Sequence, residues 1–171
     1  MTSGMMPGAT SGPPGTAAGS TPTGRLEALG VELPEVVPPL AAYVPATRSG
    51  DQVFTAGQLP LRAGELIATG KVGTEVSVDE ATTCAQQAVL NGLAAVVSVT
   101  GDLDAVRRVV KVVVYVASAP SFTGQPMVAN GASELLGEVF GEAGAHVRSA
   151  VGVAVLPLDA PVEVELVVEV G

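Results

Sequence analysis

Two residues in the last third of the chain could do chemistry on a small acid. Arg148 is the only Lys or Arg among residues 112–171, and Glu163 follows it fifteen positions later. An arginine can hold a carboxylate through a planar set of donors that stays charged, and a carboxylate can orient or activate water. The pair could equally be a structural ion pair at the end of a strand. Both interpretations require a fold that brings the two side chains together.

The segments that carry these residues both predict strands. Apolar and small residues alternate from Ala150 to Val155, and apolar and acidic residues alternate from Val162 to Leu166. A period of two is typical of strands with two unlike faces. Two prolines and an aspartate between the segments mark a bend. We therefore expect an antiparallel pair of strands in which Arg148 and Glu163 face each other.

Two helices are expected to support these strands. Ser77 and Glu80 have the spacing of a capping box, and Gly101 ends the helix that follows. Small residues recur along this helix at helical spacing, which would let one face lie close to a sheet. Cys84 belongs to that row, and we interpret it as a small buried side chain rather than a nucleophile because no base neighbours it. A second helix is expected over residues 126–140, beginning at a proline.

Three more strand patterns complete the predicted sheet. Residues 43–48 and 52–56 flank a turn at residues 49–51 and predict a hairpin. The nearly continuous apolar run at residues 109–116 is typical of a central strand covered on both faces. Because the chain has too few helices to cover both faces, we expect a partner subunit on the second face. The element order predicts an α+β fold with the helices on one face of a mixed sheet.

Composition limits the class of protein and the molecules it could bind. The 171 residues are 47% apolar, which is enough for one domain with its own core. The formal net charge of −9 opposes binding to nucleic acid. One Cys and one His cannot build a zinc site alone, so no metal is expected. No apolar run reaches the roughly 18 residues of a membrane span, so we expect a cytoplasmic protein with no membrane partner.

The start of the chain differs in composition from the rest. Residues 1–24 consist mostly of Gly, Pro, Ser and Thr, without a signal-peptide pattern, and they predict a disordered tail. A short helix is expected at residues 24–30, closed by a glycine, followed by an extended linker at residues 33–39. We therefore place a single domain at residues 25–171.

Four segments together resemble the reactive intermediate deaminase family, also called YjgF-like and formerly endoribonuclease L-PSP. They are AAYVPA around Tyr43, VFTAGQLP at residues 53–60, the strand at residues 109–116, and Arg148-Ser149 with LPLDAPVEVE. The similarity covers about residues 39–170, and GASELLGEVFGEAGAHVRSAVGVAVLP is similar to a longer branch of the family. The resemblance implies a chorismate-mutase-like fold in a homotrimer, with three sheets around a central barrel and sites between subunits.

The resemblance also implies an activity and its residues. The family hydrolyses enamines and imines of amino acids to 2-oxo acids and ammonia, without a cofactor. Carried over by position, Arg148 would bind the substrate carboxylate and Glu163 would position or activate water. The substrate-binding residues that the resemblance implies are Tyr43, Ala56, Gly57, Ser133 and Arg148.

The chain departs from the family pattern at three places, which leaves the substrate range open. Ala56 stands where the family often has Ser, so one hydroxyl contact is missing. His146 stands where Pro is common, and it is either a surface histidine or a proton shuttle. Asn130 and Ser133 are both candidates for the polar residue that the second helix usually supplies.

Three functions follow from these observations. The first is an imine and enamine deaminase. The second is a non-catalytic homotrimer that binds small carboxylates as a regulatory or chaperone-like protein. The third, a ribonuclease, is weakened by the negative charge. Glu165 points the same way along its strand as Glu163, and it is either a second site acid or a pore-facing one.

Overall fold

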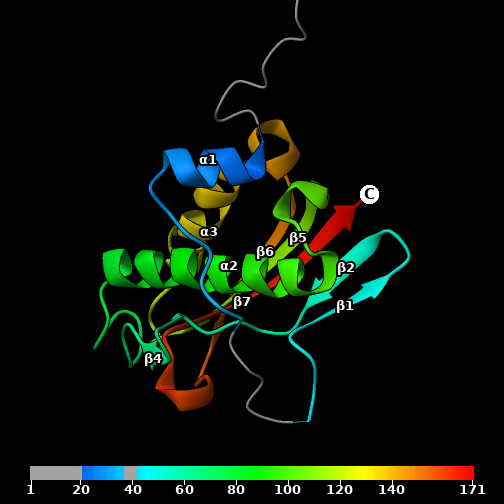
Figure 1. The fold of residues 1–171 in the computed structure, drawn as a ribbon. Coiled ribbons are helices and arrows are strands. Elements are labelled where there is room, and N and C mark those ends of the chain that lie inside the picture. Colours follow the sequence, from blue (N-terminus) through cyan, green and yellow to red (C-terminus); the bar gives the residue numbers. More distant parts are fainter. Residues whose placement is uncertain (1–20, 37–41) are drawn as a thin grey trace, which may run out of the picture.

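The computed structural model describes residues 21–36 and 42–171, and its centre is a five-stranded sheet (Figure 1). The strand order is β1-β2-β7-β5-β6. The strands are β1 (Ala46–Ser49), β2 (Gln52–Thr55), β5 (Val106–Ala117), β6 (Val147–Val153) and β7 (Val162–Val170). β5 and β6 run parallel, and the other neighbouring strands run antiparallel. The sheet is therefore mixed, as the sequence predicted.

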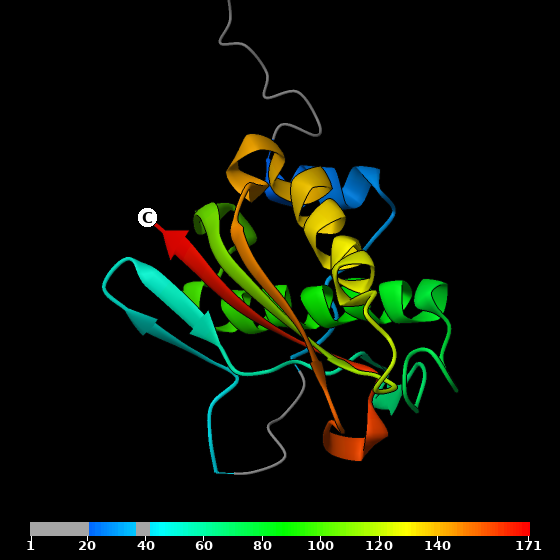
Figure 2. The same ribbon diagram turned by 180° about the vertical axis from the view of Figure 1, so that it is seen from behind.

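Two long helices, α2 (Val78–Thr100) and α3 (Gln125–Phe140), pack on one face of this sheet (Figures 1 and 2). This confirms the predicted α+β arrangement. The smaller elements are α1 (Pro22–Ala28), β3 (Leu61–Arg62), β4 (Glu65–Leu66), and the 3-10 helices η1 (Leu103–Ala105), η2 (Gly141–Gly144) and η3 (Pro157–Asp159). β3 and β4 form a separate two-stranded sheet in the loop before α2.

Local sequence signals explain where α2 begins and how closely it packs. The Ser77 hydroxyl accepts from the Glu80 N–H, and the Glu80 carboxylate accepts from the Ser77 N–H, which completes the predicted capping box. Gly101 ends the helix at φ 80°. The two helices approach closely, because a Cβ at Gly131 of α3 would lie 2.5 Å from the Thr82 carbonyl oxygen of α2. Small residues therefore set the spacing of the helical layer.

The expected antiparallel pair of β6 and β7 is wrong. β5 lies between the two strands, pairing in parallel with β6 and antiparallel with β7. The physical reason is the nearly continuous apolar run at residues 109–116 of β5, since a mainly apolar strand is best placed in the centre of a sheet. The connection from β6 to β7 therefore passes across the end of β5 instead of forming a hairpin.

Two predicted element boundaries shift. β1 begins at Ala46 and not at residue 43, and the hairpin turn is at Gly50, with φ 62°. α1 begins at Pro22, where the Thr21 hydroxyl caps it by accepting from the Gly24 N–H. The expected boundary between residues 24 and 25 falls inside this helix. The expectations for residues 1–20 and for the linker at 37–39 lie outside the described residues.

The two faces of the sheet carry different residues. Paired residues on neighbouring strands share a face, and successive residues alternate between faces. The face under the helices is fully apolar at its centre, where Val112, Val164 and Leu166 are buried. The opposite face, which no described helix covers, is mixed. It carries Tyr115, Glu163, Glu165, Val113, Val151, Val147 and Phe54.

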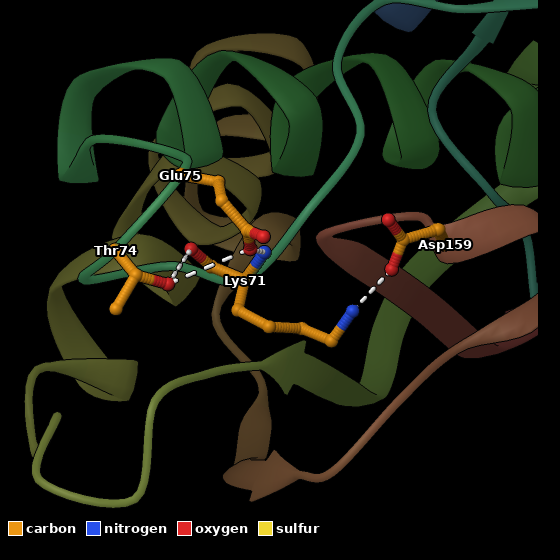
Figure 3. A network of polar contacts seen from close by, with 4 residues as sticks. All are labelled: Lys71, Thr74, Glu75 and Asp159. Carbon is orange, nitrogen blue, oxygen red and sulfur yellow. Dashed lines mark hydrogen bonds and ion pairs between the residues drawn. The ribbon is translucent and has the colours of Figure 1, made fainter.

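The turn before β7 is tied to the loop before α2 (Figure 3). Lys71 forms an ion pair with Asp159, and the Gly70 N–H donates to the Asp159 carbonyl at 2.9 Å. Hydrogen bonding to Asp159 raises the pKa of Lys71. Glu75 accepts from the Lys71 N–H at 2.7 Å, so the loop is itself held in shape. These contacts hold the turn that directly precedes β7, the strand on which Glu163 lies.

Candidate functional site

Arg148 lies beneath α3, on the helix-covered side of the sheet. It pairs with the buried Val112 in β5, so its side chain points toward the helices. Its Nη1 donates to Asn130 Oδ1 and to Ser133 Oγ, both at 3.0 Å. Its Nη2 donates to the Pro126 carbonyl at 3.4 Å. Both residues proposed for the second helix therefore contact Arg148, because they lie three positions apart on one face of α3.

The partners of Arg148 are all neutral oxygen atoms. No carboxylate in the part of the chain that the structure describes pairs with this guanidinium. Its Nε–H and one of the two Nη2 hydrogens have no acceptor among the described residues. A positive charge held in place with two donors left over suits binding of a carboxylate.

An open groove begins at Arg148 and continues along α3 toward η2. Its volume is about 470 Å³. The residues lining it are Ser133, Gly137, Gly141, Gly144, Ala145, His146 and Arg148. His146 is half-buried there, with Nε2 at 3.0 Å from Ser133 Oγ and Nδ1 at 2.6 Å from the Gly144 carbonyl. It is therefore a hydrogen-bonded part of this cluster rather than a loose surface residue.

Glu163 lies on the other face of the sheet, against the backbone of Gly57. A Cβ built on Gly57 would be 1.7 Å from Glu163 Oε1, so only glycine leaves room for this carboxylate. The contact is set by the neighbouring pair Gln58 and Val164, which exchange two backbone hydrogen bonds of 2.9 and 3.0 Å. Burial, followed by the charge of Glu165, raises the pKa of Glu163.

Tyr115 joins the Glu163 cluster, although it was not among the site residues expected from the sequence. It pairs directly with Glu163 across β5 and β7, and its hydroxyl donates to Glu165 Oε2 at 3.3 Å. Burial, followed by the charge of Glu165, raises the pKa of Tyr115. The sequence does contain one signal for this role. Tyr115 is a polar aromatic residue within the apolar run at residues 109–116, and its place in the strand alternation puts it on the same face as the two acids.

Tyr43 and Ala56 lie near the Glu163 cluster rather than near Arg148. Ala56, next to Gly57, donates its N–H to the Pro45 carbonyl at 2.9 Å. Tyr43 precedes Pro45 by two residues, lies outside β1, and is 48% exposed. The site residues expected from the sequence thus form two groups within one chain. In one, Asn130 and Ser133 contact Arg148, and in the other, Gly57 contacts Glu163, with Ala56 next to Gly57 and Tyr43 on the segment that Ala56 bonds.

Other candidate chemistries have little support in the described residues. Cys84 is buried on α2, and burial raises the pKa of its thiol to about 11, which keeps it in the unreactive form. No cluster of three or more His, Cys, Asp or Glu suited to a metal ion occurs within residues 21–36 and 42–171. None of the helices found in these ranges is both long and apolar enough to cross a membrane.

Comparison with known proteins gives one consistent family. Residues 23–170 match the family model described as "YjgF/chorismate_mutase-like, putative endoribonuclease". Protein TCP17 of Trypanosoma cruzi is 45% identical over 148 residues, which are 86% of this chain and 92% of that protein. A solved structure from Shewanella oneidensis, titled "putative endoribonuclease", is 35% identical with a TM-score of 0.86, covering 88% of this chain and all of that one.

A more distant structure shows a ligand. The E. coli protein TdcF, solved with bound serine, is 25% identical with a TM-score of 0.57, covering 81% of this chain and 93% of that one. The family match spans nearly all of the described residues, including both groups of candidate site residues. The chain therefore belongs to the YjgF/chorismate mutase-like family.

Proposed function

We propose that the protein hydrolyses imines and enamines of amino acids to 2-oxo acids and ammonia. The observation that carries this proposal is Arg148, whose guanidinium is held by three neutral acceptors and keeps its Nε–H and one Nη2 hydrogen without an acceptor among the described residues. Such a group selects a substrate with a carboxylate and contributes about 1.5–3 kcal/mol per charge-assisted contact. The serine bound to TdcF, which also has a carboxylate, supports the same class of ligand here.

The reaction needs little beyond oriented water and one group that moves a proton. With the substrate carboxylate on Arg148, water adds to the carbon of the protonated imine while Glu163 accepts one of its protons, which gives a neutral carbinolamine. The Glu163 carboxyl returns that proton to nitrogen. As the C–N bond breaks, Glu163 takes the hydroxyl proton, which leaves the 2-oxo acid and ammonia, and ammonia then takes the proton from Glu163 and leaves as ammonium. A carboxylate with a raised pKa suits this exchange, since a catalytic acid or base works best near the working pH.

Arg148 and Glu163 of one chain cannot share a substrate, because they project from opposite faces of the sheet. We therefore propose a homotrimer in which Arg148 of one subunit meets Glu163 of the next. The apolar residues on the uncovered face support this assembly, since Val147 is 66% exposed, Val151 43% and Phe54 38%. Val147 and Val151 lie on one face of β6, and exposed apolar side chains on a sheet face that no described helix covers mark a candidate subunit contact. We place this trimer in the cytoplasm, as the sequence suggested.

The same Arg148 cluster favours a second candidate, a non-catalytic protein that binds small carboxylates. Binding needs only Arg148, Asn130 and Ser133, whereas hydrolysis also needs Glu163. The name endoribonuclease, given to the Shewanella structure, is a weaker candidate because the net charge of −9 repels phosphate.

The deciding experiment follows the loss of 2-iminopropanoate, generated in a coupled assay, with and without the purified protein. We expect the parent to accelerate hydrolysis and Arg148→Ala to lower kcat/KM by about ten- to a hundredfold, at 1.36 kcal/mol for each factor of ten. Arg148→Lys should also be impaired, because it keeps the charge but loses the planar donor edge. Arg48→Ala is the matched control, since Arg48 is an exposed arginine that also donates to a backbone carbonyl.

Two results would contradict the proposal. Parental turnover in a folded Arg148→Ala variant would reject the site. A parent that binds pyruvate but does not accelerate hydrolysis would leave the carboxylate-binding protein as the function.

A further inference from the structure

The only histidine of the chain is hydrogen-bonded to the residue that holds Arg148. His146 Nε2 lies 3.0 Å from Ser133 Oγ, and the same oxygen lies 3.0 Å from Arg148 Nη1. On its other side, His146 Nδ1 lies 2.6 Å from the Gly144 carbonyl. A continuous line of polar contacts thus runs from the η2 backbone through the imidazole and the hydroxyl to the guanidinium.

The Gly144 carbonyl at one end of this line and the Arg148 guanidinium at the other determine where each proton lies. A carbonyl only accepts, so the hydrogen at that end is on Nδ1 of His146. In the neutral ring, Nε2 is then an acceptor, and the Ser133 hydroxyl must donate to it. A guanidinium only donates, so the Ser133 oxygen accepts from Arg148. For the neutral ring, only this arrangement of protons satisfies all three contacts.

We infer that His146 is a positioning residue of the carboxylate site. The neutral ring, protonated at Nδ1, keeps the hydroxyl hydrogen of Ser133 directed away from Arg148, so that a lone pair is always available to the guanidinium. Ser133 and Asn130 then occupy both Nη1 hydrogens and the Pro126 carbonyl accepts from Nη2, so that Nε–H and the remaining Nη2 hydrogen stay available to the ligand. The ligand part of this inference rests on the proposed function, whereas the proton arrangement does not.

This role differs from that of a proton shuttle. His146 reaches Arg148 only through Ser133, and Glu163 lies across the sheet, so the imidazole has no described path to the reacting atoms within its own chain. Its contribution is to the orientation of Arg148. Removing it should therefore weaken carboxylate binding and raise KM more than it lowers kcat.

A single histidine makes the proton arrangement directly measurable. Tag-free protein labelled with ¹⁵N in the imidazole gives one ring spin system, which needs no assignment. Long-range ¹H–¹⁵N correlation at neutral pH should show a protonated Nδ1 and an unprotonated Nε2. Ser133→Ala should shift the Nε2 resonance more than Nδ1, because it removes the partner of Nε2. Ser98→Ala, which deletes a hydroxyl of α2 that donates to the Ala95 carbonyl, should leave both resonances unchanged.

Affinity for pyruvate tests the positioning role. His146→Ala and Ser133→Ala should each weaken pyruvate binding by about three- to tenfold, the range for one lost hydrogen bond. The double variant should be no weaker than either single variant, because both remove the same connection. His146→Gln, whose amide oxygen can accept from Ser133, should recover part of the loss. Melting temperature identifies any variant that fails to fold. In that case the ring spectrum of the parent still tests the proton arrangement.

The possible failures can be told apart. A ring protonated at Nε2, or unchanged pyruvate affinity in a folded His146→Ala variant, would overturn the role of His146 and leave the proposed function in place. Absence of pyruvate binding by the parent at millimolar concentration would overturn the carboxylate site, and the positioning role with it.

Discussion

Arg148 and Glu163 project from opposite faces of the central sheet, and β5 separates the strands that carry them. Arg148 shares a face with the buried Val112, whereas Glu163 shares one with Tyr115. A structural ion pair between them within one chain, the alternative considered from sequence, is therefore excluded. Each chain instead presents one group of candidate site residues on each side of its sheet, and the proposed trimer would join the two unlike groups.

The contact between Gly57 and Glu163 gives the first prediction. Gly57→Ala would place a methyl group 1.7 Å from the present position of Glu163 Oε1 and so displace the carboxylate. Because the displaced atoms are the end of a flexible side chain, we expect kcat for imine hydrolysis to fall at least about tenfold with little change in melting temperature. In a Glu163→Ala background the same substitution should have no further effect on kcat. Additive losses would show that Gly57 acts in another way.

The second prediction concerns the pH dependence of activity. Burial first, and then the charge of Glu165, raises the pKa of Glu163, so this carboxyl ionises at a higher pH than an ordinary glutamate. A reaction that needs the carboxylate should speed up as pH rises through that pKa. Glu165→Gln removes one of the two causes, and it should move the midpoint of the kcat profile to lower pH. A midpoint that stays in place would mean that Glu163 does not control the rate.

The same shift has a consequence for folding stability. A carboxyl whose pKa is higher in the folded state binds its proton more tightly there, so its ionisation costs stability. Glu163→Gln should therefore be more stable than the parent above the folded pKa of Glu163. The difference should vanish as pH falls below the unfolded pKa. Chemical denaturation at several pH values measures both limits, and a variant less stable at neutral pH would contradict this sign.

The uncovered sheet face gives the third prediction. Val151→Glu places a charge among the exposed apolar residues of that face and should convert the proposed trimer to a monomer with unchanged secondary structure. Light scattering and circular dichroism measure the two properties. Val99→Glu is the control, since Val99 is similarly exposed, at 38%, but lies on α2. A parent that is already monomeric at micromolar concentration would reject the trimer and the shared site.

The thiol of Cys84 gives the fourth prediction. Burial raises its pKa to about 11, so at pH 8 only about one thiol in a thousand is ionised. We expect no reaction with a disulfide reagent over hours in the native protein, and one equivalent within minutes in denaturant. Rapid reaction of the native protein would reveal an opening of the helical layer around α2.

The start of the domain gives the fifth prediction. A chain beginning at Ser20 should keep the parental melting temperature, since the removed residues have a composition that cannot form a core. A chain beginning at Arg25 also loses the Thr21 cap and the hydrogen bond from the Thr23 N–H to Asp104. We expect that chain to be less stable by about 1 kcal/mol. Equal melting temperatures for the two chains would show that α1 contributes nothing.

Local features of the fold could be predicted from sequence, because their signals are local. The capping box at Ser77, the glycine that ends α2 and the apolar run of β5 each depend on residues near one another in the chain. The position of β1 was missed in part because Tyr43 looks like a strand residue, whereas Pro45 interrupts the pattern and pairing begins at Ala46.

The arrangement of the site could be predicted only in part. Alternation within β6 and β7 is the same whether the strands are neighbours or separated, so the pattern alone could not show that β5 lies between them. The alternation of side chains along β6 does carry information about the face on which Arg148 lies. Arg148 and Ala150 share a face, and Ala150 packs against the core, which places Arg148 under the helices. The contact of His146 with Ser133 depends on how η2 turns, and no local motif encodes it.

The position of β7 has a consequence for the synthesis of this protein on the ribosome. β7 is made after every other strand, yet it pairs with both β2 and β5 and so occupies the middle of the sheet. Until it emerges, the β1–β2 hairpin has no neighbour and one long apolar edge of β5 stays open, which is a surface prone to association. The sheet must therefore close after translation of this segment, and a synthetic peptide of residues 156–171 should bind the chain truncated before it.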